Sequence, residues 1–188
     1  FSVDLQEGWI DAKGVTDIAA VTFALSTALA NHGIKEKKVS LCINNHSVIY
    51  RELLIPKVED KRIPFVVRSE MIATLDLNKD HIIDFMILDE VIEAHKPQLR
   101  VLGVAISQKA LSSYVETCVK LNLKVDNAEP ATTAMIKLVE KSKVCDDGRP
   151  VIIADVEDEI LKLYLFENDK YVFIRNTKLV VGENGNHS

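Results

Sequence analysis

The fold class is decided by two consecutive runs, Ile82-Ile-Asp-Phe-Met-Ile-Leu-Asp-Glu-Val-Ile92 and Gln98-Leu-Arg-Val-Leu-Gly-Val-Ala-Ile106, and by the polar stretch Glu93-Ala-His-Lys-Pro97 between them. Both runs are rich in β-branched and aromatic residues, which predicts two strands joined as a hairpin. Ser107 then caps a helix that runs to about Asn122, because apolar residues recur there at helical spacing. Strands that alternate with helices predict a mixed α/β (α+β) chain.

Upstream of this hairpin the pattern predicts two helices and two more strands. A helix is expected from Val15 to His32, with Thr16 or Asp17 as its cap. The β-type runs Val39–Ile43 and Ser47–Ile55 follow, and the short turn between them predicts a hairpin. The second helix is expected within residues 57–74, with its start near Pro64.

Downstream, a short strand over Leu123–Asn127 leads to Pro130, which is expected to open a helix that ends near Lys143. The loop Cys145–Pro150 is a candidate domain boundary. Three strands follow, over residues 151–155, 160–166 and 171–181. They have no helix of their own to cover a second face, so we expect the chain to be part of a longer protein.

Composition limits the function classes. The chain has 188 residues, of which 47% are apolar and 27% charged, as in globular proteins. Its net charge of −5 provides no basic field for nucleic acid. The longest uncharged run, Ile18 to Ile34, is too short and too polar to span a membrane.

No motif predicts a catalytic residue or a metal site. The cysteines, Cys42, Cys118 and Cys145, lie far apart, and no Cys or His spacing typical of a metal site is present. Cys42 and Cys118 are expected to be core residues, because one falls in a β run and the other on an apolar helix stripe. A GxSxG nucleophile motif and a glycine-rich phosphate loop are also missing.

Two groups of charged residues allow more than one interpretation. Asp155 and Glu157 follow a β run, so they form either a solvated turn or a carboxylate site for hydrated Mg²⁺ beside a phosphate. Arg51 lies on a predicted strand and Glu70 on the next helix, and the structural interpretation of this pair is a surface ion pair.

Several strings follow one another in order along nearly the whole chain: Val39-Ser-Leu-Cys-Ile43, Val48-Ile-Tyr-Arg-Glu-Leu-Leu-Ile-Pro56, Phe65-Val-Val-Arg-Ser-Glu70, Ile83-Asp-Phe-Met-Ile-Leu88, Leu102-Gly-Val-Ala-Ile106, Asn127-Ala-Glu-Pro130, Val151-Ile-Ile-Ala-Asp155 and Tyr171-Val-Phe-Ile-Arg175. These strings, in this order, resemble the type IV pilus assembly protein PilM family. In the family pattern Arg51 and Pro56 lie on and after a strand, and Glu70 lies on the helix that follows.

The resemblance implies an actin-like, FtsA-like fold, present here as a partial chain. Residues 1–10 would end the first core subdomain, and residues 11–106 would form the inserted, hairpin-rich subdomain. Residues 107–149 would continue the first core subdomain, and residues 150–188 would begin the second half of the fold.

Family members bind ATP with Mg²⁺ and hold the short cytoplasmic tail of the inner-membrane protein PilN. The resemblance therefore implies a cytoplasmic scaffold at the inner face of the membrane, in contact with PilN and other components of the pilus machine. The resemblance does not identify the residues that would line a groove for this tail.

One departure from the family concerns the nucleotide. The second phosphate loop of the family reads Asp-x-Gly, and here the string is Asp155-Val156-Glu157. Glutamate blocks the close approach of backbone N–H groups to a phosphate and adds a negative charge. Weak or lost nucleotide binding is therefore expected, and a non-catalytic scaffold is favoured over an enzyme. The alternatives are an ATP-dependent actin-like switch, in which Asp155 positions Mg²⁺ or water, and a cell-division filament protein.

Overall fold

The computed structural model describes residues 1–145, 148–157 and 160–179, and the chain divides into two units, Phe1–Thr132 and Thr133–Ser188. Within the described residues the first unit contains three sheets and the second contains one, and each unit has its own buried residues. None of the helices in the described residues is long and apolar enough to cross a membrane.

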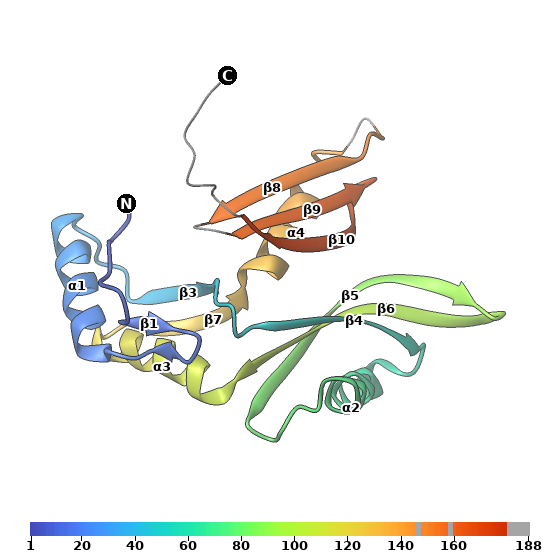
Figure 1. The fold of residues 1–188 in the computed structure, drawn as a ribbon, viewed down its shortest axis with the longest axis horizontal. Helices are drawn as coiled ribbons and strands as arrows, with labels where there is room; N and C mark the ends of the chain where they lie inside the picture. The colour runs from blue at the N-terminus through green and yellow to red at the C-terminus, as the bar shows by residue number, and fades with distance from the viewer. Residues whose placement is uncertain (146–147, 158–159, 180–188) are drawn as a thin grey trace. The chain divides into compact units, whose positions relative to one another are not determined.

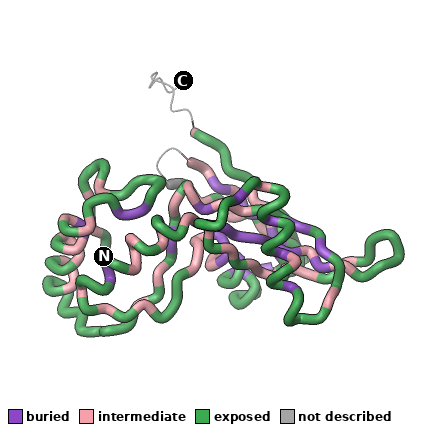
Figure 2. Tube along the Cα trace, turned by 90° about the horizontal axis from the view of Figure 1, so that it is seen from below, coloured by how far each residue is buried: buried purple, intermediate pink, exposed green. Residues whose placement is uncertain are grey.

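A three-stranded antiparallel sheet dominates the first unit (Figure 1). Its strand order is β4 (Ile49–Pro56), β6 (Lys96–Ser107) and β5 (His81–Glu93). The predicted hairpin of β5 and β6 is confirmed, and its turn is only two residues long. Both turn residues, Ala94 and His95, have positive φ angles (49° and 64°), which match the twist of a tight hairpin. The tip of this hairpin is exposed (Figure 2).

Helix α2 (Ile63–Leu75) covers one face of this sheet and follows a short 3-10 turn, η1 (Asp60–Arg62). Pro64 lies in the first turn of α2, where its missing N–H leaves no helical hydrogen bond unmade. The residues that α2 and the sheet bury together are Leu53, Ile55, Ile63, Val67, Met71, Leu77, Leu99, Val101 and Ala105.

The opposite face of β6 contributes to a second buried cluster. Val104 and Ile106 pack there with Ile43 and Val48 and with Ala110 of α3 (Gln108–Lys120). Successive strand residues point to opposite faces, so β6 contributes alternate residues to each cluster. The apolar sequence of β6 is therefore explained by burial on both faces.

Strand β3 (Lys38–Ile43) pairs in parallel with β7 (Lys124–Pro130), and β4 pairs with β6 along all its eight residues. The predicted hairpin of residues 39–43 with residues 47–55 is therefore wrong. Pairing with β6 places Leu53 and Ile55 under α2, and this burial outweighs the nearness of β3 and β4 in sequence.

The predicted capping residues of two helices in the first unit are confirmed. Asp17 caps α1 (Ile18–Asn31), because its carboxylate accepts a hydrogen bond of 2.9 Å from the N–H of Ala20. The Ser107 hydroxyl caps α3 in the same way, at 3.1 Å from the N–H of Ala110. Two short strands, β1 (Ile10–Asp11) and β2 (Gly14–Val15), precede α1.

The second unit contains most of α4 (Ala131–Ser142) and a three-stranded antiparallel sheet. The strands are β8 (Val151–Glu157), β9 (Ile160–Glu167) and β10 (Lys170–Lys178), in the order β10-β9-β8, so the three predicted strands are confirmed within the described residues. The sheet buries Tyr164, Phe166 and Tyr171, and α4 buries Ile136 and Val139.

The other face of that sheet is apolar and open in the described residues. Ile152, Val156 and Phe173 lie there, with 67%, 62% and 45% of their surface exposed. Their exposure agrees with the expectation that no helix covers the second face of these strands.

Gly103 of β6 generates a first prediction. A Cβ atom at this position would lie 2.5 Å from Sδ of Met71, which is fully buried on α2. Gly103→Ala should lower the free energy of unfolding by about 1–3 kcal/mol, because the packed core has little room to move. Urea denaturation followed by circular dichroism measures this change.

The partner variant is Met71→Ala, which removes the contacted atoms and should cost about 2–5 kcal/mol alone. The double variant should lose less unfolding free energy than the sum of the two single losses, because the new methyl group fills part of the cavity. Full additivity would contradict the close packing of Gly103 against Met71.

Candidate functional site

Strand β4 is an outer strand of its sheet in the part of the chain that the structure describes. β4 and β5 are the two outer strands of the sheet. The register of β4 on β6 is regular from Ile49 to Pro56, whereas that of β5 shifts between Ile87 and Asp89. A bulge of this kind twists an edge away from further pairing, and β4 lacks one.

The regular edge of β4 can accept another extended chain. Every second residue of an outer strand directs its N–H and C=O groups away from its neighbour in the sheet, and a partner strand pairs with groups of this kind. Proteins usually protect such edges with lysine, proline or a bulge. β4 contains no lysine, and its one proline, Pro56, is its last residue.

Three side chains of β4 lie on the sheet face opposite α2. Tyr50, Glu52 and Leu54 alternate with Leu53 and Ile55, which are buried under α2. Leu54 has 44% of its surface exposed. A chain that lies along β4 therefore meets two apolar residues and one carboxylate on this face.

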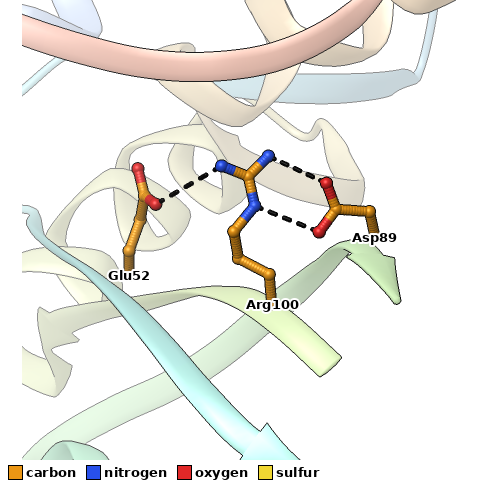
Figure 3. A network of polar contacts seen from close by, with 3 residues as sticks. All are labelled: Glu52, Asp89 and Arg100. Carbon is orange, nitrogen blue, oxygen red and sulfur yellow. Dashed lines mark hydrogen bonds and ion pairs between the residues drawn. The ribbon is translucent and has the colours of Figure 1, made fainter. Parts of the chain in front are cut away.

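Arg100 of β6 connects all three strands on the same face (Figure 3). Its Nε and Nη2 donate to the two carboxylate oxygens of Asp89 on β5, at 3.1 and 3.0 Å. Its Nη1 lies 3.8 Å from Oε2 of Glu52 on β4. The side chains of Arg100 and Asp89 are 26% and 22% exposed, so the bidentate pair is better shielded from water than most surface ion pairs.

This network fixes charge on the face. The two contacts to Asp89 hold the guanidinium in one orientation, and the longer contact brings it near Glu52. Two carboxylates and one guanidinium carry a net charge of −1. The face beside the β4 edge is therefore acidic.

The structure separates the predicted family-pattern residues. Arg51 lies in the middle of β4, opposite Gly103, and Pro56 ends the strand opposite Gln98. Glu70 is exposed on α2. Arg51 and Glu70 form no ion pair within 4 Å in the described part of the chain, so that interpretation is wrong.

Asp155 and Glu157 lie within β8, which continues to Glu157 instead of ending in a turn before Asp155. Asp155 is opposite Lys162 of β9, a lysine with only 8% of its surface exposed. The neighbouring acidic residues, Asp158 and Glu159, lie outside the described residues. No group of three potential metal ligands is present in residues 1–145, 148–157 and 160–179.

The charged network was not found from the sequence, although a signal for part of it exists. Asp89 and Arg100 belong to the two runs of the predicted hairpin, and opposite charges on paired strands favour a cross-strand contact. The bulge after Ile87 hides this contact, because it shifts the register by one residue.

The prediction that Cys42 is a core residue is wrong. Cys118 and Cys145 are buried, but Cys42 is exposed because the two-stranded β3-β7 sheet leaves one of its faces open in the described residues. Partial desolvation of the thiol, and then the nearby carboxylate of Glu129, raise the pKa of Cys42.

Cys42 should therefore be the cysteine that a maleimide reagent modifies in the folded protein. Because the thiolate reacts and its pKa is raised, the modification rate should continue to increase with pH above the pKa of a free cysteine, about 8.5. Glu129→Gln should lower this pKa and increase the rate at neutral pH. Mass spectrometry after timed labelling measures it, and preferential labelling of Cys118 would contradict the structure.

Comparison with known proteins gives two structures and one family. A chain of the "PilM-PilN type IV pilus biogenesis complex" has 21% sequence identity and a TM-score of 0.81 over 93% of this chain, which spans 52% of that one. A Bacteroides thetaiotaomicron VPI-5482 protein "with actin-like ATPase fold and unknown function" has 14% identity and a TM-score of 0.47, with 89% and 59% of the two chains covered. A search of curated proteins gives no match.

The present chain thus spans about half the length of the first matched structure and shares its fold. The predicted mixed α/β class is confirmed by the helices and sheets of the described residues and by the fold shared with this structure. The family model described as "Type IV pilus assembly protein PilM" matches residues 1–185. Since this match includes all but the last three residues, the chain belongs to the type IV pilus assembly protein PilM family.

Proposed function

We propose that this protein is a scaffold of the type IV pilus machine that docks the cytoplasmic tail of a PilN-like inner-membrane protein. Two findings support the proposal. The chain belongs to the PilM family, and the solved structure that shares its fold is described as a PilM-PilN complex.

The observation that carries this proposal is the place of β4 as an outer strand with a regular register on β6. An extended tail that adds beside β4 would gain main-chain hydrogen bonds and keep the pairing of β4 with β6. The second outer strand, β5, is a poorer acceptor because its register is broken after Ile87.

Side chains on both sides of the edge limit the tail register. Tyr50 and Leu54 provide partly exposed apolar contacts on one face, and Arg51 lies on the other face, toward α2. Main-chain pairing supplies affinity and these alternating contacts supply specificity.

Docking a membrane protein's tail would hold this protein in the cytoplasm at the inner face of the membrane, within reach of other pilus components. The subdivision into residues 1–10, 11–106, 107–149 and 150–188 stays a prediction. Strand β3 pairs with β7 across the boundary at residue 106, which joins two of these segments in one sheet.

We further propose that the nucleotide site is degenerate. Glu157 stands where the family pattern has glycine, and β8 runs through this position as a regular strand. Two carboxylates in place of a phosphate-binding turn oppose the charge of ATP.

The first test uses the N-terminal cytoplasmic peptide of the PilN-like protein from the same genome, labelled for fluorescence anisotropy. We expect saturable binding to the protein and no binding of a scrambled peptide. Strand addition uses the backbone N–H groups of alternate peptide residues. N-methylation of one alternate set of residues should therefore abolish binding, and N-methylation of the other set should leave it nearly unchanged.

Equal losses of binding for the two N-methylated peptides would contradict docking by strand addition.

Leu54→Asp is the matched protein variant, since it changes an exposed side chain on β4 without touching the core under α2. It should weaken binding at least tenfold, because a carboxylate replaces an apolar contact at the edge. Ile92→Asp, at the exposed hairpin tip, should leave binding unchanged.

The second test adds MgATP to the same titration. A degenerate nucleotide site predicts the same tail affinity with and without MgATP, and no MgATP binding in the micromolar range by calorimetry. Tail binding that requires MgATP would favour the ATP-dependent switch instead.

A further inference from the structure

We propose that one face of helix α2 contacts an anionic lipid surface, with the ring of Phe65 in the headgroup layer and three cations around it paired with lipid phosphates. This face, called the outer face of α2 below, consists of Lys61, Arg62, Phe65, Arg68 and Ile72. A lipid contact at this face goes beyond tail docking and needs no bound tail.

The apolar residues of the outer face point away from the sheet. The sheet side of α2 is occupied by Ile63, Val67 and Met71, each with 3% or less of its surface exposed. Phe65 and Ile72 are seven residues apart and so share the opposite side of the helix, where they are 78% and 37% exposed. A single exposed apolar residue is common on protein surfaces, but two on one helix face form a patch.

Three cationic side chains surround Phe65. Arg68 follows it by three residues, and Lys61 and Arg62 precede it by four and three residues, in the 3-10 turn that leads into α2. At these spacings side chains are neighbours on a helix surface. All three cations are exposed, and none of them forms an ion pair within 4 Å among the residues that the structure describes.

The nearest acidic residues lie off the outer face. Asp60 and Glu70 are each five residues from Phe65, and residues five apart on a helix point about 140° away from each other. Glu59 precedes the 3-10 turn. The field around the exposed ring is therefore positive, although the whole chain carries a net charge of −5.

Another exposed phenylalanine of the same unit lacks such cations. Phe23 of α1 is 75% exposed, nearly as much as Phe65. The residues three and four positions from it are uncharged: Ala19, Ala20, Ser26 and Thr27. Phe23 is therefore a matched control, because it has the same side chain on a helix at the same exposure without the surrounding charge.

The outer face has the chemistry of a helix that lies on a membrane. Such helices direct apolar residues into the headgroup layer, and the long side chains of lysine and arginine beside them reach the phosphates. The choice of lipid over an acidic protein rests on the docking proposal, since the tail of an inner-membrane protein would hold this chain near the headgroups. One aromatic ring and three cations bind weakly alone, so the two attachments would reinforce each other.

Flotation of the full chain with lipid vesicles tests this contact, with no tail peptide present. The protein should float with vesicles of phosphatidylglycerol and phosphatidylcholine but not with phosphatidylcholine alone. Binding should be lost at about 1 M salt, where the Debye length is ~3 Å. Arg68→Gln should weaken binding about fivefold, because each cation near an anionic surface contributes a factor of this size.

Serine variants at the two exposed phenylalanines separate the outer face of α2 from exposure in general. Phe65→Ser should weaken vesicle binding about fivefold or more, because the apolar ring no longer leaves water. Phe23→Ser should leave binding unchanged. Both positions are exposed, and circular dichroism verifies that both variants keep the fold.

Tryptophan variants report where the protein meets the lipid. In the presence of anionic vesicles that contain brominated lipid, the fluorescence of Phe65→Trp should be quenched more than that of Phe23→Trp, and Trp9 contributes equally to both. Equal quenching of the two variants, or equal flotation with neutral and anionic vesicles, would overturn the lipid contact. An absence of vesicle binding would do the same and would leave the outer face of α2 to an acidic protein.

These outcomes are independent of the test of tail docking. None of the vesicle experiments contains the tail, so their failure leaves the docking proposal intact. A tail peptide that does not bind in the anisotropy titration overturns docking and leaves the vesicle results as they are.

Discussion

Strand β6 is the element on which both buried clusters of the first unit depend. Its residues Leu99, Val101 and Ala105 pack under α2, while Val104 and Ile106 pack with β3 and α3 on the other face. A strand that is buried on both faces must lie between two neighbours, so β4 and β5 become the outer strands. The positions of α2, α3 and the outer strands follow from this one placement.

The same placement determines where polar residues are tolerated. The second buried cluster includes Val104 and Ile106 near the end of β6. Near the start of β6, on the same face, Arg100 contacts Asp89 and Glu52 on the two neighbouring strands. The sheet therefore has one closed apolar face, under α2, and one face that changes from apolar to charged along β6. The proposed docking edge lies beside this change, so main-chain pairing, apolar contacts and charge are available to a single extended peptide.

Much of the fold could be predicted from local patterns. The capping residues Asp17 and Ser107 and the β5-β6 hairpin follow from local spacing and short-range hydrogen bonds. The pairing of β3 with β7 could not, because these strands are about eighty residues apart and only the buried clusters select the pair. The exposure of Cys42 and the Arg100 network both follow from such long-range choices, and the bulge in β5 adds a register shift that periodicity does not reveal.

Amide hydrogen exchange of the protein, with and without the cognate tail peptide, shows whether a tail docks along β4. With the tail bound, exchange should slow at alternate residues of β4, those whose N–H groups point away from β6, while the amides of β5 keep their rates. Protection confined to β5, or to helix α2, with saturating tail peptide would contradict docking along β4.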